Sequence, residues 1–423
     1  MTGAVSSCHA LLRKDITEAM DAASRKVIEN KFLADEIRGI VKDVYGDEWD
    51  GVPVNTCEAA LWVTIDSLFT PPFQGRGDNY RARYIAPYEK HLHHQGGYGR
   101  PFPPKYKDLI ADRGVTAGEL GFYGKRQNNL DTVIVPLKGA RYDCHGIKFH
   151  PAPMLTQVDP EASIAVIEEV AERHRHLLTG FTSLSYDTPG YGYGAKDPDG
   201  TPRLQRLMGE LAKKYNVPYL GDNAWGVPFV GTDPRKVHAD VMVYSMDKAS
   251  GAPTVGLIIG KEDVMVTIRR ALGTHGERSG VPLSYGKAAY VTNDAGKEGI
   301  VGLIAALKVL RDRPEVVTKP IDDLYAIVVE EFAKLDLPKD LKDGWLITKS
   351  YNSSSVEVNY EGTWKDGKLG VPIFTIEDMY AGTGLLQSGM AQMGIVPTLS
   401  YDGNIFISPG LGTTDEEGKI IED

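Results

Sequence analysis

The alternation of apolar and polar positions changes its period along the chain. Between residues 11 and 45, charged and apolar positions recur at helical spacing, which predicts one or two amphipathic helices. Residues 52–69 then read as a short strand, a polar turn at Asn55 and Thr56, and a helix. The stretch from 70 to 105 is rich in Gly, Pro, Tyr and His and shows little periodicity, so we predict a long loop there.

From residue 131 onward, short apolar runs alternate with segments of helical periodicity. Strands that alternate with helices of ten to fifteen residues predict crossover units and a mostly parallel sheet. The predicted strands cover 131–137, 180–186, 217–225, 239–248 and 255–261, and the predicted helices cover 159–177 and 202–216.

The last part of the chain reads as a separate, smaller unit. Residues 285–312 predict a long helix that leads out of the sheet domain, and helix, strand, helix and strand follow. We therefore expect a helical N-terminal segment at 1–50, a large α/β domain at 51–313 and a small α+β domain at 314–423.

Composition is consistent with an ordinary globular protein and excludes few functions. Apolar residues make up 42% of the 423 residues and charged residues 25%, so a packed core is expected. The net charge of −10 argues against a nucleic-acid surface. Three scattered cysteines give neither a disulfide framework nor a metal cluster, and no run of eighteen apolar residues predicts a membrane span. Without the pattern of a signal peptide, a cytoplasmic location is the default expectation.

Two predicted strands end in polar clusters, Asp222-Asn223-Ala224 and Ser245-Met246-Asp247-Lys248. Ligands of parallel sheets bind at the carboxyl ends of the strands, so both clusters should face one crevice. A lysine beside a serine and opposite a carboxylate suits a cofactor that needs an amine link, a phosphate contact and a partner for a cationic ring nitrogen. The alternative interpretation, a turn aspartate and a surface lysine, fits each residue alone but not their joint order and spacing.

These residues resemble the core of the fold-type-I pyridoxal-phosphate enzymes, the aspartate aminotransferase superfamily. The shared pattern is a strand-ending Asp with Ala two residues later, then Ser-x-x-Lys, then Gly-x-Pro-x-x-Gly. Within that superfamily the chain is most similar to the selenocysteine synthase and phosphoseryl-tRNA-to-cysteinyl-tRNA synthase branch, over about residues 120–313. The matching residues are Asp222 and Ala224, Ser245 and Lys248, and then Gly251, Pro253 and Gly256.

The resemblance implies a large domain with a mostly parallel sheet of the seven-stranded type, flanked by helices. It implies that pyridoxal 5'-phosphate is the cofactor and that Lys248 forms a Schiff base with it and later moves a proton. Asp222 would pair with the ring nitrogen and keep it protonated, Ala224 would lie against the ring, and Ser245 would donate to the phosphate.

The resemblance also suggests where the rest of the cofactor is held. The segment 55–59 opens the helix after the first strand, in the position of the phosphate-binding turn, which makes Thr56 and Cys57 candidates. An ordinary threonine N-cap is the alternative, and Glu58 is unfavourable beside a phosphate unless its side chain points away. Further candidates are Tyr142 and His145 for stacking on the ring, Arg141 for an anionic substrate group, and Asp187 for the phenolic side of the ring. A loop tyrosine and a solvent histidine remain the alternatives for the stacking pair.

The segment 273–280 resembles a loop that desulfurase relatives send into the phosphate site of a neighbouring subunit. Val281 stands where those relatives carry a threonine, so a backbone contact from Ser279 or Gly280 is the remaining candidate. Arg278 is a second candidate for a substrate carboxylate. The loop implies a homodimer or a higher homo-oligomer. The histidines of the predicted loop lack metal-ligand spacing, and we expect no metal at His91, His93 and His94.

Absences narrow the reaction. No arginine follows Arg313, and Phe406 stands where many aminotransferases of this fold carry the arginine that binds the substrate carboxylate. The last cysteine is Cys144, which disfavours a desulfurase, and the acidic chain offers no basic arm for tRNA. We therefore expect carbanion chemistry on an amino acid or another amine, as a lyase or a β- or γ-replacement enzyme. The alternatives are an aminotransferase with a non-standard amine and a non-catalytic, cofactor-binding regulatory homologue.

Overall fold

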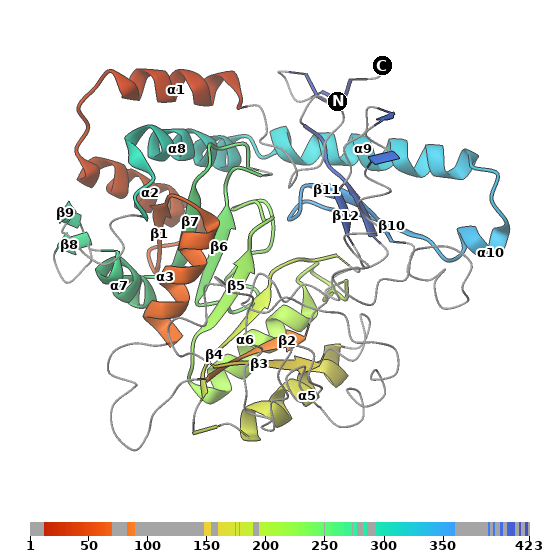
Figure 1. Cartoon of the computed structure of the whole chain (residues 1–423), viewed down its shortest axis with the longest axis horizontal. Helices are drawn as coiled ribbons and strands as arrows, with labels where there is room; N and C mark the ends of the chain where they lie inside the picture. The colour runs from red at the N-terminus through yellow and green to blue at the C-terminus, as the bar shows by residue number, and fades with distance from the viewer. Residues whose placement is uncertain are drawn as a thin grey trace.

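A computed structural model gives the architecture of most of the chain (Figure 1). Two helices are the first elements of its described part. They are α1 (Lys14–Ser24) and α2 (Asn30–Tyr45), as the helical spacing predicts. The structure describes residues 12–69, 83–88, 148–153, 160–173, 175–176, 178–188, 194–248, 250–272, 274–276, 282–285 and 293–359, and beyond these 388–389, 392–393, 398–400, 404–410, 414–415 and 419–421.

A seven-stranded sheet forms the centre of the molecule (Figure 1). The strands β2, β3, β4, β5 and β6 pair in parallel, and β7 runs antiparallel to both of its neighbours. The prediction of a mostly parallel sheet is therefore confirmed. Across the sheet the order is β1 (Trp49–Val54), β7 (Gly256–Lys261), β6 (Val241–Ser245), β5 (Tyr219–Asn223), β4 (Leu178–Leu184), β2 (Arg83–Tyr88) and β3 (Lys148–Pro153).

Helices cover both faces of this sheet, and the strands bury apolar side chains toward each. One face packs against α3 (Cys57–Phe69) and α7 (Glu262–Ala271) through residues such as Leu220 and Val243. The other face packs against α2, α5 (Pro160–Arg173), α6 (Arg203–Tyr215) and α8 (Gly296–Asp312). Because side chains alternate along a strand, Asp222 shares the α3 face with Leu220 and Ala224, and Asn223 faces the opposite way.

A buried ion pair cluster fixes the strand that leads to α3. Asp50 in β1 is fully buried and pairs with Arg38 of α2, Nε to Oδ1 at 3.2 Å, and with Arg269 of α7. Burial, with a smaller contribution from Arg38, lowers the pKa of Arg269 to about 10. The guanidinium therefore stays charged at neutral pH, and the cluster ties β1 to a helix on each face of the sheet.

A second, four-stranded antiparallel sheet lies beside the first. Helix α9 (Glu315–Lys334) packs against this sheet. Phe406 is 3% exposed, and its ring meets that of Trp225 edge-on with centroids 5.2 Å apart, so Phe406 joins the small sheet to the loop after β5. The strands in order are β10 (Leu346–Ser350), β11 (Ser355–Asn359), β13 (Asn404–Ile407) and β12 (Thr398–Ser400), and the remaining elements are α10 (Lys339–Lys342), β8 (Thr274–Gly276) and β9 (Pro282–Tyr285).

Several sequence predictions need correction. The predicted loop at 70–105 contains β2, and β3 was not predicted, because each short strand carries proline, which is unusual inside a sheet. The helix predicted from residue 285 begins at Gly296, whose φ of +70° is not helical. Helix α7 and strand β10 were not predicted at all.

Other predictions remain open. The strand at 131–137 lies outside the described residues, as does most of the second helix expected in the small domain, which the sequence places at 378–394. The domain limits after residues 50 and 313 stay predictions, although β1 already begins at Trp49 and α9 begins directly after Pro314.

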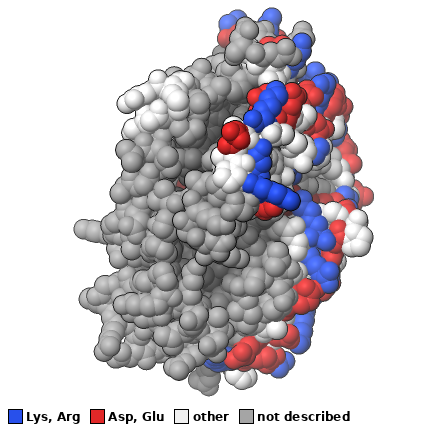
Figure 2. Space-filling view, turned by 90° about the vertical axis from the view of Figure 1, so that its right-hand side faces the viewer, with Lys and Arg blue, Asp and Glu red and all other residues white. Residues whose placement is uncertain are grey.

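The described part of the surface carries charges of both signs side by side. Figure 2 shows Lys and Arg next to Asp and Glu on one face of the molecule. Ion pairs within α9 are of this kind, such as Lys334 Nζ with Glu330 Oε1 at 2.9 Å and Lys319 with Asp323. Within the described residues, no helix combines the length and the apolar character that crossing a membrane requires.

Candidate active site

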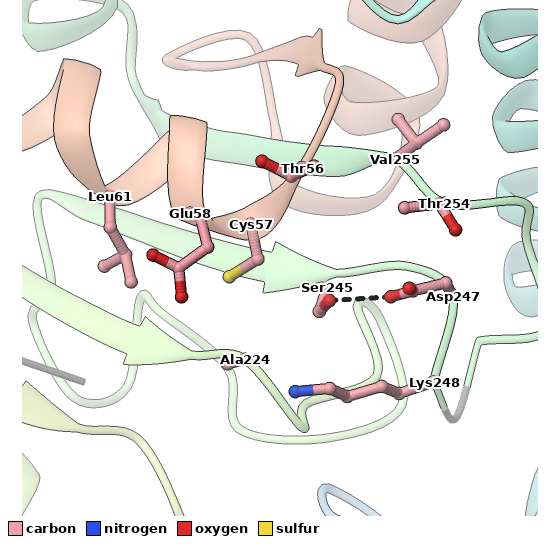
Figure 3. A pocket seen from close by; sticks show the side chains of 10 residues that line it. All are labelled: Thr56, Cys57, Glu58, Leu61, Ala224, Ser245, Asp247, Lys248, Thr254 and Val255. Atoms are coloured by element: carbon pink, nitrogen blue, oxygen red, sulfur yellow. Dashed lines mark hydrogen bonds between the residues drawn. The ribbon is translucent and has the colours of Figure 1, made fainter. Parts of the chain in front are cut away.

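A pocket of about 240 Å³ opens at the carboxyl ends of β5 and β6, next to the N-terminus of α3. It brings together side chains from three segments that are far apart in the sequence (Figure 3). Five of the predicted site residues line it, and the prediction that the two strand-end clusters share a crevice agrees with this geometry. The lining residues are Thr56, Cys57, Glu58, Leu61, Ala224, Ser245, Asp247, Lys248, Thr254 and Val255.

The turn after β6 presents Lys248 to the pocket. The backbone N–H of Ala252 donates to the carbonyl of Met246 at 3.0 Å, which closes the turn. Gly251 has φ of +66°, a left-handed conformation that glycine adopts without strain. The side chain of Lys248 is half-buried, and Figure 3 shows its amine extending across the pocket toward Ala224.

Ser245 and Asp247 form a hydrogen-bonded pair beside the lysine. The Ser245 hydroxyl donates to Asp247 Oδ1 at 2.7 Å (Figure 3). A hydroxyl can rotate, so Ser245 can donate to a ligand only if it leaves Asp247. The Ser-x-x-Lys pattern places Ser245 at the strand end, but the pattern gives no sign of this competing acceptor.

The N-terminus of α3 forms the opposite wall. Thr56 Oγ1 accepts the backbone N–H of Ala59 at 3.1 Å, so Thr56 is an N-cap as well as a pocket residue. The first N–H groups of a helix have no partners within the helix, and the helix dipole favours an anion there. This wall can therefore attract a phosphate or a carboxylate.

Glycine at position 256 allows this wall to approach the sheet. A Cβ at Gly256 would lie 2.2 Å from the carbonyl oxygen of Thr56 and 2.9 Å from the backbone nitrogen of Cys57. Both are backbone atoms, so no rotation of a side chain can relieve the clash. The last glycine of the Gly-x-Pro-x-x-Gly pattern thus sets the distance between β7 and α3.

We expect Gly256→Ala to destabilise the fold by about 1–3 kcal/mol, as overpacking does, and to disturb the pocket wall. Gly39→Ala is the matched control, because Gly39 lies exposed in α2 with nothing within 4 Å of an added Cβ. That change should stabilise the helix by about 0.5–1 kcal/mol. Urea denaturation of both variants measures the difference, and equal stabilities would contradict the account of Gly256.

Asp222 is not among the residues that line the pocket. Its side chain is fully buried, on the α3 face of the sheet and two residues before the pocket-lining Ala224. A carboxylate in such a site favours a cationic partner strongly, because water does not screen the interaction.

The opposite face of the same strand ends holds a buried amide network that the sequence did not reveal. Asn223 and Asn352 exchange two hydrogen bonds, each 3.0 Å long, and Asn352 Nδ2 also donates to the carbonyl of Ser185 at 2.9 Å. The backbone N–H of Thr232 donates to Asn352 Oδ1 at 2.9 Å. This network ties the turn between β10 and β11 to the strand end that carries Asp222.

The structure does not bring every candidate to the pocket. Asp187 accepts hydrogen bonds from Lys196 Nζ at 3.0 Å and from the Ser350 hydroxyl, and it is not among the pocket residues. Within the described residues, no cluster of three or more metal-binding side chains occurs. The candidates Arg141, Tyr142, His145, Arg278, Ser279 and Gly280 and the three histidines at 91, 93 and 94 lie outside the described residues.

Comparison with known proteins adds the fold family. No protein-family model and no curated protein matches the chain. Among solved structures, an adenosylmethionine-8-amino-7-oxononanoate aminotransferase from Methanocaldococcus jannaschii is 14% identical with a TM-score of 0.58, over 98% of this chain and 85% of that chain. An S-selective transaminase from Arthrobacter sp. is 12% identical with a TM-score of 0.58, over 96% of this chain and 82% of that chain.

A complex of SepCysS with the N-terminal domain of SepCysE also matches, at 12% identity and a TM-score of 0.52, over 97% of this chain and 90% of that chain. These likenesses show the fold. The chain has the α/β fold of the fold-type-I pyridoxal-phosphate transferases, which confirms the predicted fold class.

Proposed function

We propose that the chain is a pyridoxal-phosphate-dependent enzyme that acts on an amino acid or another amine. The observation that carries the proposal is the meeting of Lys248, Ser245 and Ala224 with the N-terminus of α3 around one pocket. The fold shared with two aminotransferases and with SepCysS supports it.

The residues of the pocket fit this cofactor in most respects. Thr56 and Cys57 stand at a helix N-terminus that suits a phosphate, and the small Ala224 leaves room for a flat ring. Asp222 is buried on the face from which it can pair with a ring nitrogen. Glu58 is the departure, because it adds a negative charge on the phosphate side.

Each residue then has a defined task. Lys248 would hold the cofactor through its amine, and this amine would be free again once a substrate amine has taken its place. The cofactor, when bound, supplies an electron sink for the carbanion next to the substrate nitrogen. Lys248 then moves a proton at the substrate carbon, and Asp222 keeps the ring nitrogen protonated.

We propose elimination or replacement rather than transamination of common amino acids. Phe406 is buried against Trp225, so this strand position offers no positive charge that could bind a substrate carboxylate. No arginine follows Arg313 in the sequence. Without a bidentate clamp, a common amino acid is poorly oriented for proton loss. Arg141 and Arg278 are the candidates to hold a carboxylate instead.

Transamination of a non-standard amine is the second candidate, because solved structures with this fold include an omega-transaminase and other aminotransferases. A homodimer that shares its active sites also remains a proposal.

The test is turnover by the cofactor-loaded protein across a panel of amino acids and amines, with and without 2-oxoglutarate. We expect release of ammonia or of another leaving group without any oxo-acid acceptor. Rapid glutamate formation from 2-oxoglutarate would favour the aminotransferase instead. Absence of turnover with every amine, despite bound cofactor, would favour the non-catalytic homologue.

A further inference from the structure

Glu58 places a negative charge where a phosphate is expected. It is the second residue of α3, and its carboxylate points into the pocket with the side chains of Cys57 and Leu61 (Figure 3). Lys248 is the one cation among the described residues that line this pocket. Asp247 adds a second carboxylate, which accepts a hydrogen bond from the hydroxyl of Ser245.

The position of Glu58 has a simple electrostatic consequence. The N-terminus of a helix favours an anion, and a carboxylate in the first turn already provides one. Helix α3 is 13 residues long, so its dipole is developed. A phosphate that binds at the same terminus must displace this carboxylate or accept its repulsion.

We propose that Glu58 is a specificity-determining residue that weakens the grip of the pocket on the cofactor's phosphate. Its carboxylate is an internal competitor for the N-terminus of α3. The inference rests on the proposed function, because it concerns the phosphate of the same cofactor. The wild-type protein should therefore prefer pyridoxal 5'-phosphate over pyridoxal by a smaller factor than the same pocket without the charge of Glu58.

The test separates the phosphate from the rest of the cofactor. Dissociation constants of pyridoxal 5'-phosphate and of pyridoxal are measured by visible absorption for wild type and for Glu58→Gln. Glutamine keeps the shape of the side chain and removes its charge. We expect affinity for pyridoxal phosphate to rise about fivefold in Glu58→Gln while affinity for pyridoxal stays unchanged, since like charges at an exposed site interact only weakly.

Two control variants make the result specific. Glu58→Asp keeps the charge and should keep the wild-type preference within about twofold, a difference well below one decade of affinity. Glu298→Gln removes a carboxylate from the exposed start of α8 and should change neither constant. Thermal unfolding of each variant verifies that the fold is retained.

The remaining outcomes overturn the proposal. An equal gain for both compounds would mean that Glu58 affects the ring rather than the phosphate. An unchanged or weaker affinity for pyridoxal phosphate in Glu58→Gln would mean that its charge does not oppose the phosphate. If wild-type protein bound neither compound, the proposed function itself would fail, and that result is distinct from the other two.

Discussion

Lys248→Ala is expected to lower turnover by about 10³-fold or more while the fold is retained. The lysine has two tasks in the proposed mechanism, since it bonds to the cofactor and later moves the proton at the substrate carbon. The effect on folding should be small, because Lys248 is half-buried on a turn that backbone hydrogen bonds close. Steady-state kinetics with cofactor in excess, together with the melting temperature, measure both effects.

Lys213→Ala is the matched control for this change. Lys213 is an exposed lysine near the end of α6, which packs on the face of the sheet opposite to α3, and it does not line the pocket. Its replacement should leave turnover unchanged. An active Lys248→Ala variant, or an equal loss in Lys213→Ala, would contradict the role given to Lys248.

Asp222→Asn is expected to reduce transition-state stabilisation by about 2–4 kcal/mol, the usual effect of one preorganised electrostatic partner. This corresponds to a loss of about thirtyfold to a thousandfold in kcat/KM. Asparagine has nearly the same shape but no charge to keep a ring nitrogen protonated. Complete burial of Asp222 strengthens the effect, because solvent does not screen the charge.

The control for Asp222→Asn is Asp240→Asn. Asp240 immediately precedes β6, at the end opposite to Ser245, where it pairs with Lys261 Nζ at 2.6 Å and accepts the backbone N–H of Tyr219. Its loss should lower stability without a specific loss of kcat/KM. Unchanged turnover in Asp222→Asn would contradict the role given to Asp222.

The strand-end clusters were predictable because their signals are local. An apolar run of about five residues followed by Asp222 or by Ser245 marks the end of a buried strand, and parallel pairing brings such ends to one edge. Ser245 ends β6, and Lys248 follows three residues later in the connection to β7. The start of α3 was also predicted from a local signal, the polar pair Asn55 and Thr56 before an apolar run. Thr56 caps the helix whether or not a phosphate binds there.

What the sequence could not reveal depends on tertiary contacts. Asn223 and Asn352 are 129 residues apart in the chain, and neither position carries a pattern that pairs them. The direction of Glu58 depends on how α3 is rotated about its axis, which its sequence leaves open. Strands β2 and β3 were not predicted because each contains proline, which lowers strand propensity. Their parallel pairing in the sheet outweighs this weak propensity.

The most direct test of the central claim is to reduce the cofactor-loaded protein with borohydride and to map the modified peptide by mass spectrometry. Borohydride converts the bond between a lysine and the cofactor aldehyde into a stable amine, so the label records which lysine was bonded. We expect the label on the peptide that contains Lys248, and none on this position in Lys248→Ala. A label on Lys213 or Lys287, or no saturable label at all, would contradict the assignment of Lys248 as the residue that holds the cofactor.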